Sequence, residues 1–264
     1  LFLLLNFLLL YKVQIIKALF FGSIKFFDFD NYYHSARDIL AGQHPYRLPY
    51  MQTLGPPLVY LFFLPFTFFP LIQARRLITF VNLASCYFSS YLLAKTFFRQ
   101  QKFLTSLFLN LVLLFSFTAR FNIFMGQPNI FLTLLITIVL VNKRVKIKGF
   151  SLALASIVKT FLGFASLALL KKNKRVFSWF VVFFFSGFLL SLIFIKPDDY
   201  LDFFSNRFSQ IAFVAAKPKN LDYYNQSLKS TMFRLGIGEF YSYIYPIVLI
   251  LAGGFLFFSG SLQA

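Results

Sequence analysis

The chain has 264 residues, of which 59% are hydrophobic and only 13% are charged. Soluble domains are about half apolar and about a quarter charged, so this composition excludes a soluble globular protein and indicates an integral membrane protein. The net charge of +18 lies in short Lys/Arg clusters between apolar runs, which is typical of cytoplasmic loops, and we expect no nucleic-acid partner.

The apolar runs predict an all-α fold, a polytopic transmembrane helical bundle that forms a single domain over residues 1–264. About 20 apolar residues cross a bilayer as a helix, and the runs lack the alternation of a membrane β-barrel. Because the chain begins inside an apolar run and without Met, we expect it to be truncated at one or both ends. The eight predicted membrane segments are 1–22, 57–72, 77–98, 103–119, 129–142, 149–170, 176–195 and 241–258.

Two of these segments do not fit a simple alternation across the membrane, and we expect them to be broken or re-entrant. Segment 57–72 is interrupted by prolines, which break helices. Segment 149–170 lies between the basic clusters KRVKIK, 143–148, and KKNKR, 171–175. If both clusters are cytoplasmic, this segment has to enter the membrane and return. Such broken helices are tolerated where they line a cavity.

Two long polar stretches, 25–55 and 196–240, carry all the acidic residues of the chain. No acid occurs from 39 to 197, where the basic clusters lie, so the positive-inside pattern predicts that both stretches are extracytoplasmic loops. The single cysteine, Cys86, excludes an internal disulfide and a Cys-rich metal site. The acidic residues are Asp28, Asp30, Asp38, Asp198, Asp199, Asp202, Asp222 and Glu239.

Within the first loop, the spacing of apolar residues in YYHSARDILAG predicts a short helix on the membrane surface, ended by Gly42. Asp28 and Asp30 are expected just before this helix, where the N-terminal amides favour negative charge. The DFD pattern of Asp28 and Asp30 is also seen in metal-binding sites, but oxygen-ligand metals need more donors. We therefore expect no metal.

Five motifs occur in the order DFDNYYHSARDILAGQHPY, GPPLVYLFFLPFTFFP, GQPNIFLTLL, ALASIVKTF and NQSLKSTMFRLG. This series, from about residue 28 to 236, resembles glycosyltransferase family 87, whose members are membrane mannosyltransferases. The resemblance implies the GT-C architecture and a polyprenyl-phosphate-linked sugar donor. It also implies inverting transfer of mannose or a similar hexose to a lipid- or glycan-bound hydroxyl, on the extracytoplasmic face of the cell membrane and without a cofactor.

The same resemblance implies roles for residues of the first loop. The family's acid stands four residues before a tyrosine, which selects Asp28 as general base and Tyr32 as its neighbour. A positioned carboxylate contributes about a hundredfold to ten-thousandfold as a general base. The alternative is that Asp28 only caps the following helix. Asp30 and His44 are assigned to substrate binding, with a surface-turn position as the alternative for His44.

Two cations are candidates for binding the donor phosphate. Lys159 lies within a long apolar run, where a cation costs about 2.5–3.5 kcal/mol on insertion scales, so we expect it to face a polar cavity. The alternative is snorkelling to the headgroups. Family members usually have proline after this lysine, and Thr160 stands there instead, which puts a kink at this point in doubt. Arg234 has the planar fork that suits phosphate, with pairing to anionic headgroups as the alternative.

The remaining candidate substrate-binding residues are polar groups near the ends of apolar runs. Gln127 and Asn129 match the family's Gly-Gln-x-Asn and are expected to bind sugar hydroxyls, with helix capping as the alternative. The others are Arg120, Asn225, Gln226 and Ser227. Two rival functions stay open: a transporter or flippase for lipid-linked sugars, which has no need of a base at Asp28, and a scaffold subunit with a degenerate site.

Overall fold

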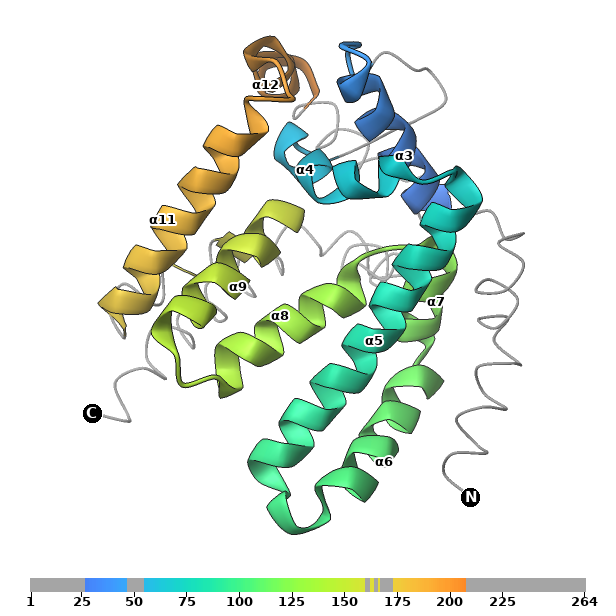
Figure 1. Cartoon of the computed structure of the whole chain (residues 1–264), viewed down its shortest axis with the longest axis vertical. Helices are drawn as coiled ribbons and strands as arrows, with labels where there is room; N and C mark the ends of the chain where they lie inside the picture. Colours follow the sequence, from blue (N-terminus) through green and yellow to red (C-terminus); the bar gives the residue numbers. More distant parts are fainter. Residues whose placement is uncertain (1–26, 47–54, 160–161, 164–165, 167–172, 208–264) are drawn as a thin grey trace, which may run out of the picture. The chain divides into compact units, whose positions relative to one another are not determined.

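The computed structural model describes residues 27–46, 55–159, 162–163, 166 and 173–207, and this part of the chain is helical and contains no strand (Figure 1). The all-α prediction is therefore confirmed for the described residues. The chain divides into two compact units, Leu1–Tyr200 and Leu201–Ala264, and the candidate site residues within the described ranges belong to the first unit. The helices are α3 (Phe27–Leu40), α4 (Tyr60–Phe63), α5 (Leu71–Phe97), α6 (Lys102–Phe115), α7 (Phe117–Met125), α8 (Asn129–Val141), α9 (Val145–Val158), α11 (Lys174–Ser191) and α12 (Pro197–Asp202).

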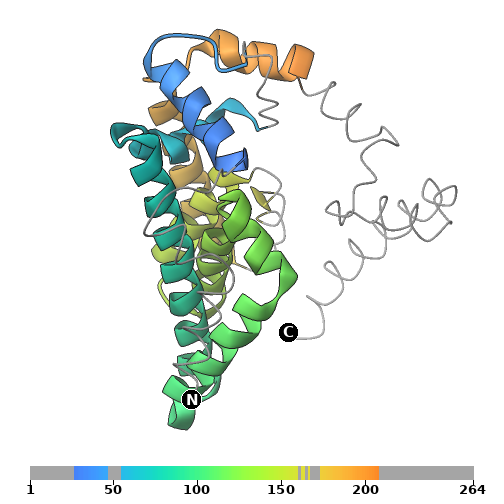
Figure 2. The ribbon, with the colours of Figure 1, turned by 90° about the vertical axis from the view of Figure 1, so that its right-hand side faces the viewer.

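Two described helices, α5 and α11, are long and apolar enough to cross a membrane. A third span results if α6 and α7 are counted together, and these two helices meet at an angle of 71° (Figure 2). The apolar helices are those of a membrane protein, but the predicted count of about eight spans is not confirmed. The predicted spans 1–22 and 241–258 lie outside the described residues.

The predicted span 57–72 is a series of short turns rather than one helix. A 3₁₀ turn at Pro57–Val59 leads into α4, and a second 3₁₀ segment, Leu64–Phe68, follows it. Proline has no N–H to donate and clashes with the preceding turn, which explains the break at Pro65. Pro57 instead begins a 3₁₀ turn, where its missing N–H costs no hydrogen bond. The helix α5 begins directly after Pro70, earlier than the predicted start of the next span at 77.

The helix predicted in the first polar stretch is present as α3, and its start differs from the prediction. Asp28 and Asp30 lie in the first turn of α3 rather than before it. Gly42 ends the helix as predicted, because it adopts φ +70° and its N–H donates to the Ile39 carbonyl at 2.9 Å. The buried face of α3 packs on α4 and the 3₁₀ segment after it, and the Tyr33 hydroxyl donates to the Phe69 carbonyl at 2.7 Å.

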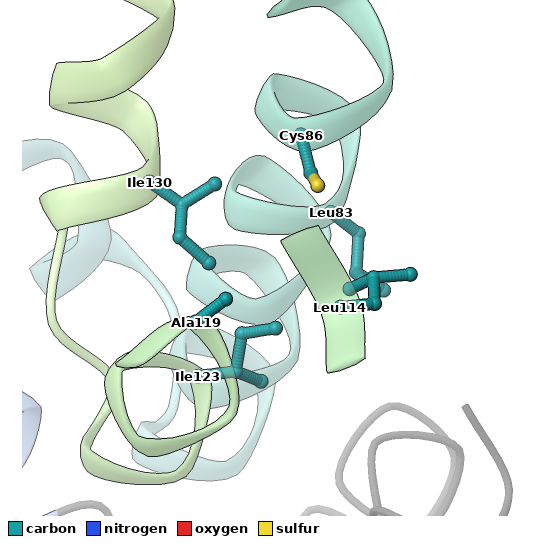
Figure 3. Close-up of a cluster of buried hydrophobic side chains, with 6 residues drawn as sticks. All are labelled: Leu83, Cys86, Leu114, Ala119, Ile123 and Ile130. Atoms are coloured by element: carbon teal, nitrogen blue, oxygen red, sulfur yellow. The ribbon is translucent and has the colours of Figure 1, made fainter. Parts of the chain in front are cut away.

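The long helix α5 is the common partner of its neighbours, because it packs against both α6 and α8, while α9 packs between α8 and α11. A cluster of buried side chains joins α5 and α6 to α7 and α8 (Figure 3). This cluster holds the turn between α7 and α8 against α5. Of the candidate site residues, Gln127 lies in that turn and Asn129 begins α8. The members of the cluster are Leu83, Cys86, Leu114, Ala119, Ile123 and Ile130.

Candidate functional site

A cavity of about 300 Å³ lies where four separate parts of the chain meet. The start of α3, the proline-rich turns before α5, the turn between α7 and α8, and the end of α9 all contribute to its wall. Polar side chains from three of these parts face one hollow, so the cavity brings together motifs that are far apart in sequence. It is lined by Asp28, Tyr32, Gly55, Pro56, Val59, Phe63, Gln127, Pro128, Asn129, Val158 and Lys159.

The carboxylate of Asp28 accepts a hydrogen bond from the side-chain amide of Gln127. The carbonyl oxygen of Gln127 in turn accepts from Asn129 Nδ2 at 2.6 Å, and the same nitrogen donates to Asn122 Oδ1. Asn122 donates to the Thr118 carbonyl at 2.7 Å. Because the Asn129 NH₂ group donates to the side-chain oxygens of both Gln127 and Asn122, the three amides orient the Gln127 NH₂ group toward Asp28.

The backbone of the α7–α8 turn is held from both sides. Gly126 ends α7 with φ +68°, a conformation in which residues with a Cβ are strained. The buried Asn82 on α5 donates to the Gln127 carbonyl at 2.9 Å, and the Gln127 N–H donates to the Asn122 carbonyl at 2.9 Å. Asn82 and Asn122 were not among the site residues predicted from the sequence. Each is an asparagine within an apolar helix, and this pattern could have identified them, because a buried amide needs a hydrogen-bond partner.

Tyr32 forms an aromatic wall of the cavity, one helical turn after Asp28 on the same face of α3. Its ring stacks on Phe63, with 4.6 Å between ring centroids and 3° between the ring planes. Burial raises the pKa of the Tyr32 phenol, and the neighbouring Tyr60 and Asp28 raise it further. The phenol therefore stays protonated and remains a hydrogen-bond donor at neutral pH.

Lys159 lines the cavity at the point where α9 ends. Its backbone is extended, with φ −138° and ψ 99°, while its N–H still donates to the Ala155 carbonyl at 2.8 Å. The helix therefore breaks at the lysine although Thr160 follows it in place of proline. An ammonium and the Asp28 carboxylate thus face the same hollow.

Three predicted residues lie outside the lining of this cavity. Asp30 forms a two-pronged ion pair with Arg75 of α5, with 2.9 Å from Nε to Oδ1 and 2.5 Å from Nη2 to Oδ2. His44 Nε2 lies 3.4 Å from Asp199 Oδ1; burial raises the pKa of Asp199 and His44 lowers it in part. Arg120 lies on α7, and its buried Nε has no hydrogen-bond partner among the described residues.

Four further candidates, Asn225, Gln226, Ser227 and Arg234, lie outside the described residues. Within the described ranges, no group of three or more His, Cys, Asp and Glu side chains is placed to hold a metal ion. Asp28 and Asp30 have separate partners, an amide and a guanidinium.

The apolar helices and the polar cavity among them define a membrane protein with a candidate site for a polar ligand. A model of glycosyltransferase family 87 matches residues 54–260, and the chain belongs to this family. The protein is therefore a membrane glycosyltransferase that acts on a sugar donor and an acceptor. The match includes Gln127, Asn129 and Lys159 and begins after Asp28 and Tyr32. A search of curated proteins and a search of solved structures each found no match.

Proposed function

We propose that the protein transfers mannose or a similar hexose from a polyprenyl-phosphate donor to a lipid- or glycan-bound hydroxyl, on the extracytoplasmic face of the cell membrane. The observation that carries this proposal is the cavity in which the Asp28 carboxylate and the Lys159 ammonium face one hollow. Inverting transfer requires a base for the acceptor and a cation for the departing phosphate. Ligand pockets measure about 300–1,000 Å³, so a cavity of about 300 Å³ suits a single sugar.

In the proposed reaction, the acceptor hydroxyl gives its proton to the Asp28 carboxylate while its oxygen bonds to the anomeric carbon from the face opposite the phosphate. The bond between that carbon and the phosphate oxygen breaks, and its electron pair leaves with the polyprenyl phosphate. Lys159 stabilises the phosphate, and Arg234 is proposed as a second phosphate ligand. No metal is required in this scheme, because cations of the chain neutralise the leaving group.

The cavity supports a refined role for the amide pair. Gln127 uses its NH₂ group toward Asp28 and its oxygen toward Asn129, so we assign both residues first to orienting the base. Sugar hydroxyls are then bound by the amide hydrogen-bonding positions that remain. Membership of the glycosyltransferase family favours a transferase over the rival transporter, which no comparison supports. A scaffold with a degenerate site would belong to the same family, and the transfer assay separates it from an active enzyme.

The first test is Asp28→Asn in membranes supplied with polyprenyl-phosphate mannose carrying a labelled sugar. The substitution keeps the shape and the hydrogen bond to Gln127 but removes the base, and we expect the rate of sugar transfer to fall about a hundredfold or more. The matched control is Asp38→Asn, the same change on the same helix at a residue outside the cavity, which should retain transfer. A D28N variant that transfers sugar at the wild-type rate would overturn the proposed mechanism.

A further inference from the structure

A second hollow, of about 560 Å³, lies at the end of α8 away from the candidate site. It is placed where the turn from α5 to α6 meets the end of α8. The helix α8 begins at the first cavity with Asn129 and ends at this hollow with Val141. The lining residues are Leu92, Lys95, Thr96, Arg99, Lys102, Val141, Asn142 and Lys143. We refer to it as the basic hollow.

The basic hollow is rich in positive charge and has no carboxylate in its lining. Its cations are Lys95, Arg99, Lys102 and Lys143, and the sequence contains no acid between residues 39 and 197. The helix α6 also begins here, and its N-cap residue Gln101 makes no side-chain capping bond. The amides at the start of a helix add to the attraction for an anion. Four cations with no carboxylate among them therefore favour an anionic ligand with more than one negative charge.

Exposed apolar side chains beside the basic hollow distinguish a lipid from a soluble anion. Phe97 is 69% exposed, Phe103 is 65% exposed and Leu140 is 70% exposed. A soluble phosphate makes no use of such surfaces, whereas the acyl chains of a phospholipid cover them. Along α5, the rise from Arg75 to Lys95 is about 30 Å at 1.5 Å per residue, which is the thickness of a bilayer's hydrocarbon core.

We propose that the basic hollow binds the headgroup of an anionic bilayer phospholipid that carries two phosphates, with its acyl chains along the exposed aromatic faces. Basic pockets at the cytoplasmic ends of membrane helices suit such headgroups. The positive-inside pattern predicts this side for Lys143 and its neighbours. The site is separate from the sugar cavity and does not depend on the proposed transfer reaction.

The test places the full chain in phosphatidylcholine nanodiscs with increasing amounts of a diphosphate phospholipid, cardiolipin, and measures bound lipid by native mass spectrometry. The paired variant R99Q/K143Q removes two cations of the basic hollow and should weaken cardiolipin binding about tenfold or more. The matched control R144Q/R175Q removes the same charge from a neighbouring hollow and should change binding less than about twofold.

Equal loss in both paired variants would show a general attraction of the basic surface and would overturn the proposal. So would competition by inorganic pyrophosphate at the concentration of the lipid, which would show a soluble-anion site. Should R99Q/K143Q fail to fold in neutral nanodiscs, the exposed single variant K143Q is measured instead, with an expected loss of about fivefold. Unchanged binding in that variant would equally overturn the site.

Discussion

At the scale of single residues, the polar chain from Asn122 to Asp28 decides how the candidate base is presented. An isolated Asp28 side chain at the edge of a cavity has several rotamers, whereas the Gln127 amide favours one of them. The direction of that amide depends on Asn129, and Asn129 depends on Asn122. In the proposed reaction, Asn122 therefore helps to orient the base although it does not line the cavity.

The variant Asn122→Leu tests this dependence. It removes the acceptor for Asn129, so the Gln127 amide loses its fixed direction, and we expect the turnover rate of sugar transfer to fall about tenfold or more with little change in the KM for the donor. The control Thr118→Val keeps the backbone carbonyl that Asn122 uses and should behave as wild type. If the KM for the donor rises as much as the turnover rate falls, and the unfolding temperature is lowered, Asn122 has only a structural role.

Gly55 forms part of the cavity wall, and its close neighbours leave no room for a side chain. A Cβ at this position would lie 2.8 Å from Val59 Cγ1 and 3.3 Å from Tyr32 Cε1. Because valine is stiff at χ1, Gly55→Ala should push Tyr32 into the cavity and raise the KM for the donor by about tenfold. The double variant G55A/V59A relieves the closest contact and should recover donor binding in the same kinetic assay. If the double variant does not recover donor binding, a displaced cavity wall is not the cause of the raised KM.

The sequence predicted a large part of the cavity and left out the residues that support it. Asp28, Tyr32, Gln127, Asn129 and Lys159 were all selected by motif, and the structure brings them together. Asp30 and His44 were selected for their residue types, yet their partners Arg75 and Asp199 lie far away in sequence. No local pattern identifies such a partner, because it depends on how helices pack.

At the scale of elements, the sequence predicted some helix boundaries and missed others, including the start of α5 directly after Pro70. Gly42 ends α3 as expected. The predicted span 103–119 instead ends at Ser116, whose hydroxyl accepts from the Ala119 N–H at 3.1 Å and so begins α7. A serine within an apolar run is a capping signal, but it is weak there because it also bonds within helices. The end of α9 at Lys159 has no such marker at all.

The packing of α9 on α11 depends on a glycine that allows close approach. A Cβ on Gly149 would lie 2.5 Å from Trp179 Cβ and 2.9 Å from the Phe180 nitrogen, atoms that cannot rotate away. We expect Gly149→Ala to destabilise the protein by about 1–3 kcal/mol, measured as a lower midpoint of thermal unfolding in detergent. Gly187→Ala is the matched control on α11, because its Cβ would meet only the tip of Ile157 at 2.6 Å, which can move. Similar shifts in both variants would argue against a close helix contact at Gly149.

At the scale of the whole molecule, charge indicates orientation, whereas hydropathy gives an incomplete count of spans. The candidate cavity and the basic hollow lie at the two ends of α8. Residues 39–197 contain basic side chains and no acidic ones, and all the acidic residues lie before or after this interval. Hydropathy identified α5 and α11, but it also marked segments whose helices are too short to cross a bilayer, such as α8. Apolar composition alone does not separate a crossing helix from one buried within the bundle.

This arrangement predicts which turns are reached from outside an intact cell. Native Cys86 is buried, so it should not react with a membrane-impermeant maleimide, and single added cysteines report on the exposed turns. Gln43→Cys, after α3, should be labelled in intact cells because the first loop is expected to be extracytoplasmic. Gln100→Cys, in the turn from α5 to α6, should be labelled only after permeabilisation, since the positive-inside pattern places its basic neighbours in the cytosol.

The side chains of Gln43 and Gln100 are both exposed, so a difference in labelling between the two variants reflects the side of the membrane rather than burial. The reverse pattern would place Asp28 on the cytosolic side and would remove the proposed extracytoplasmic reaction.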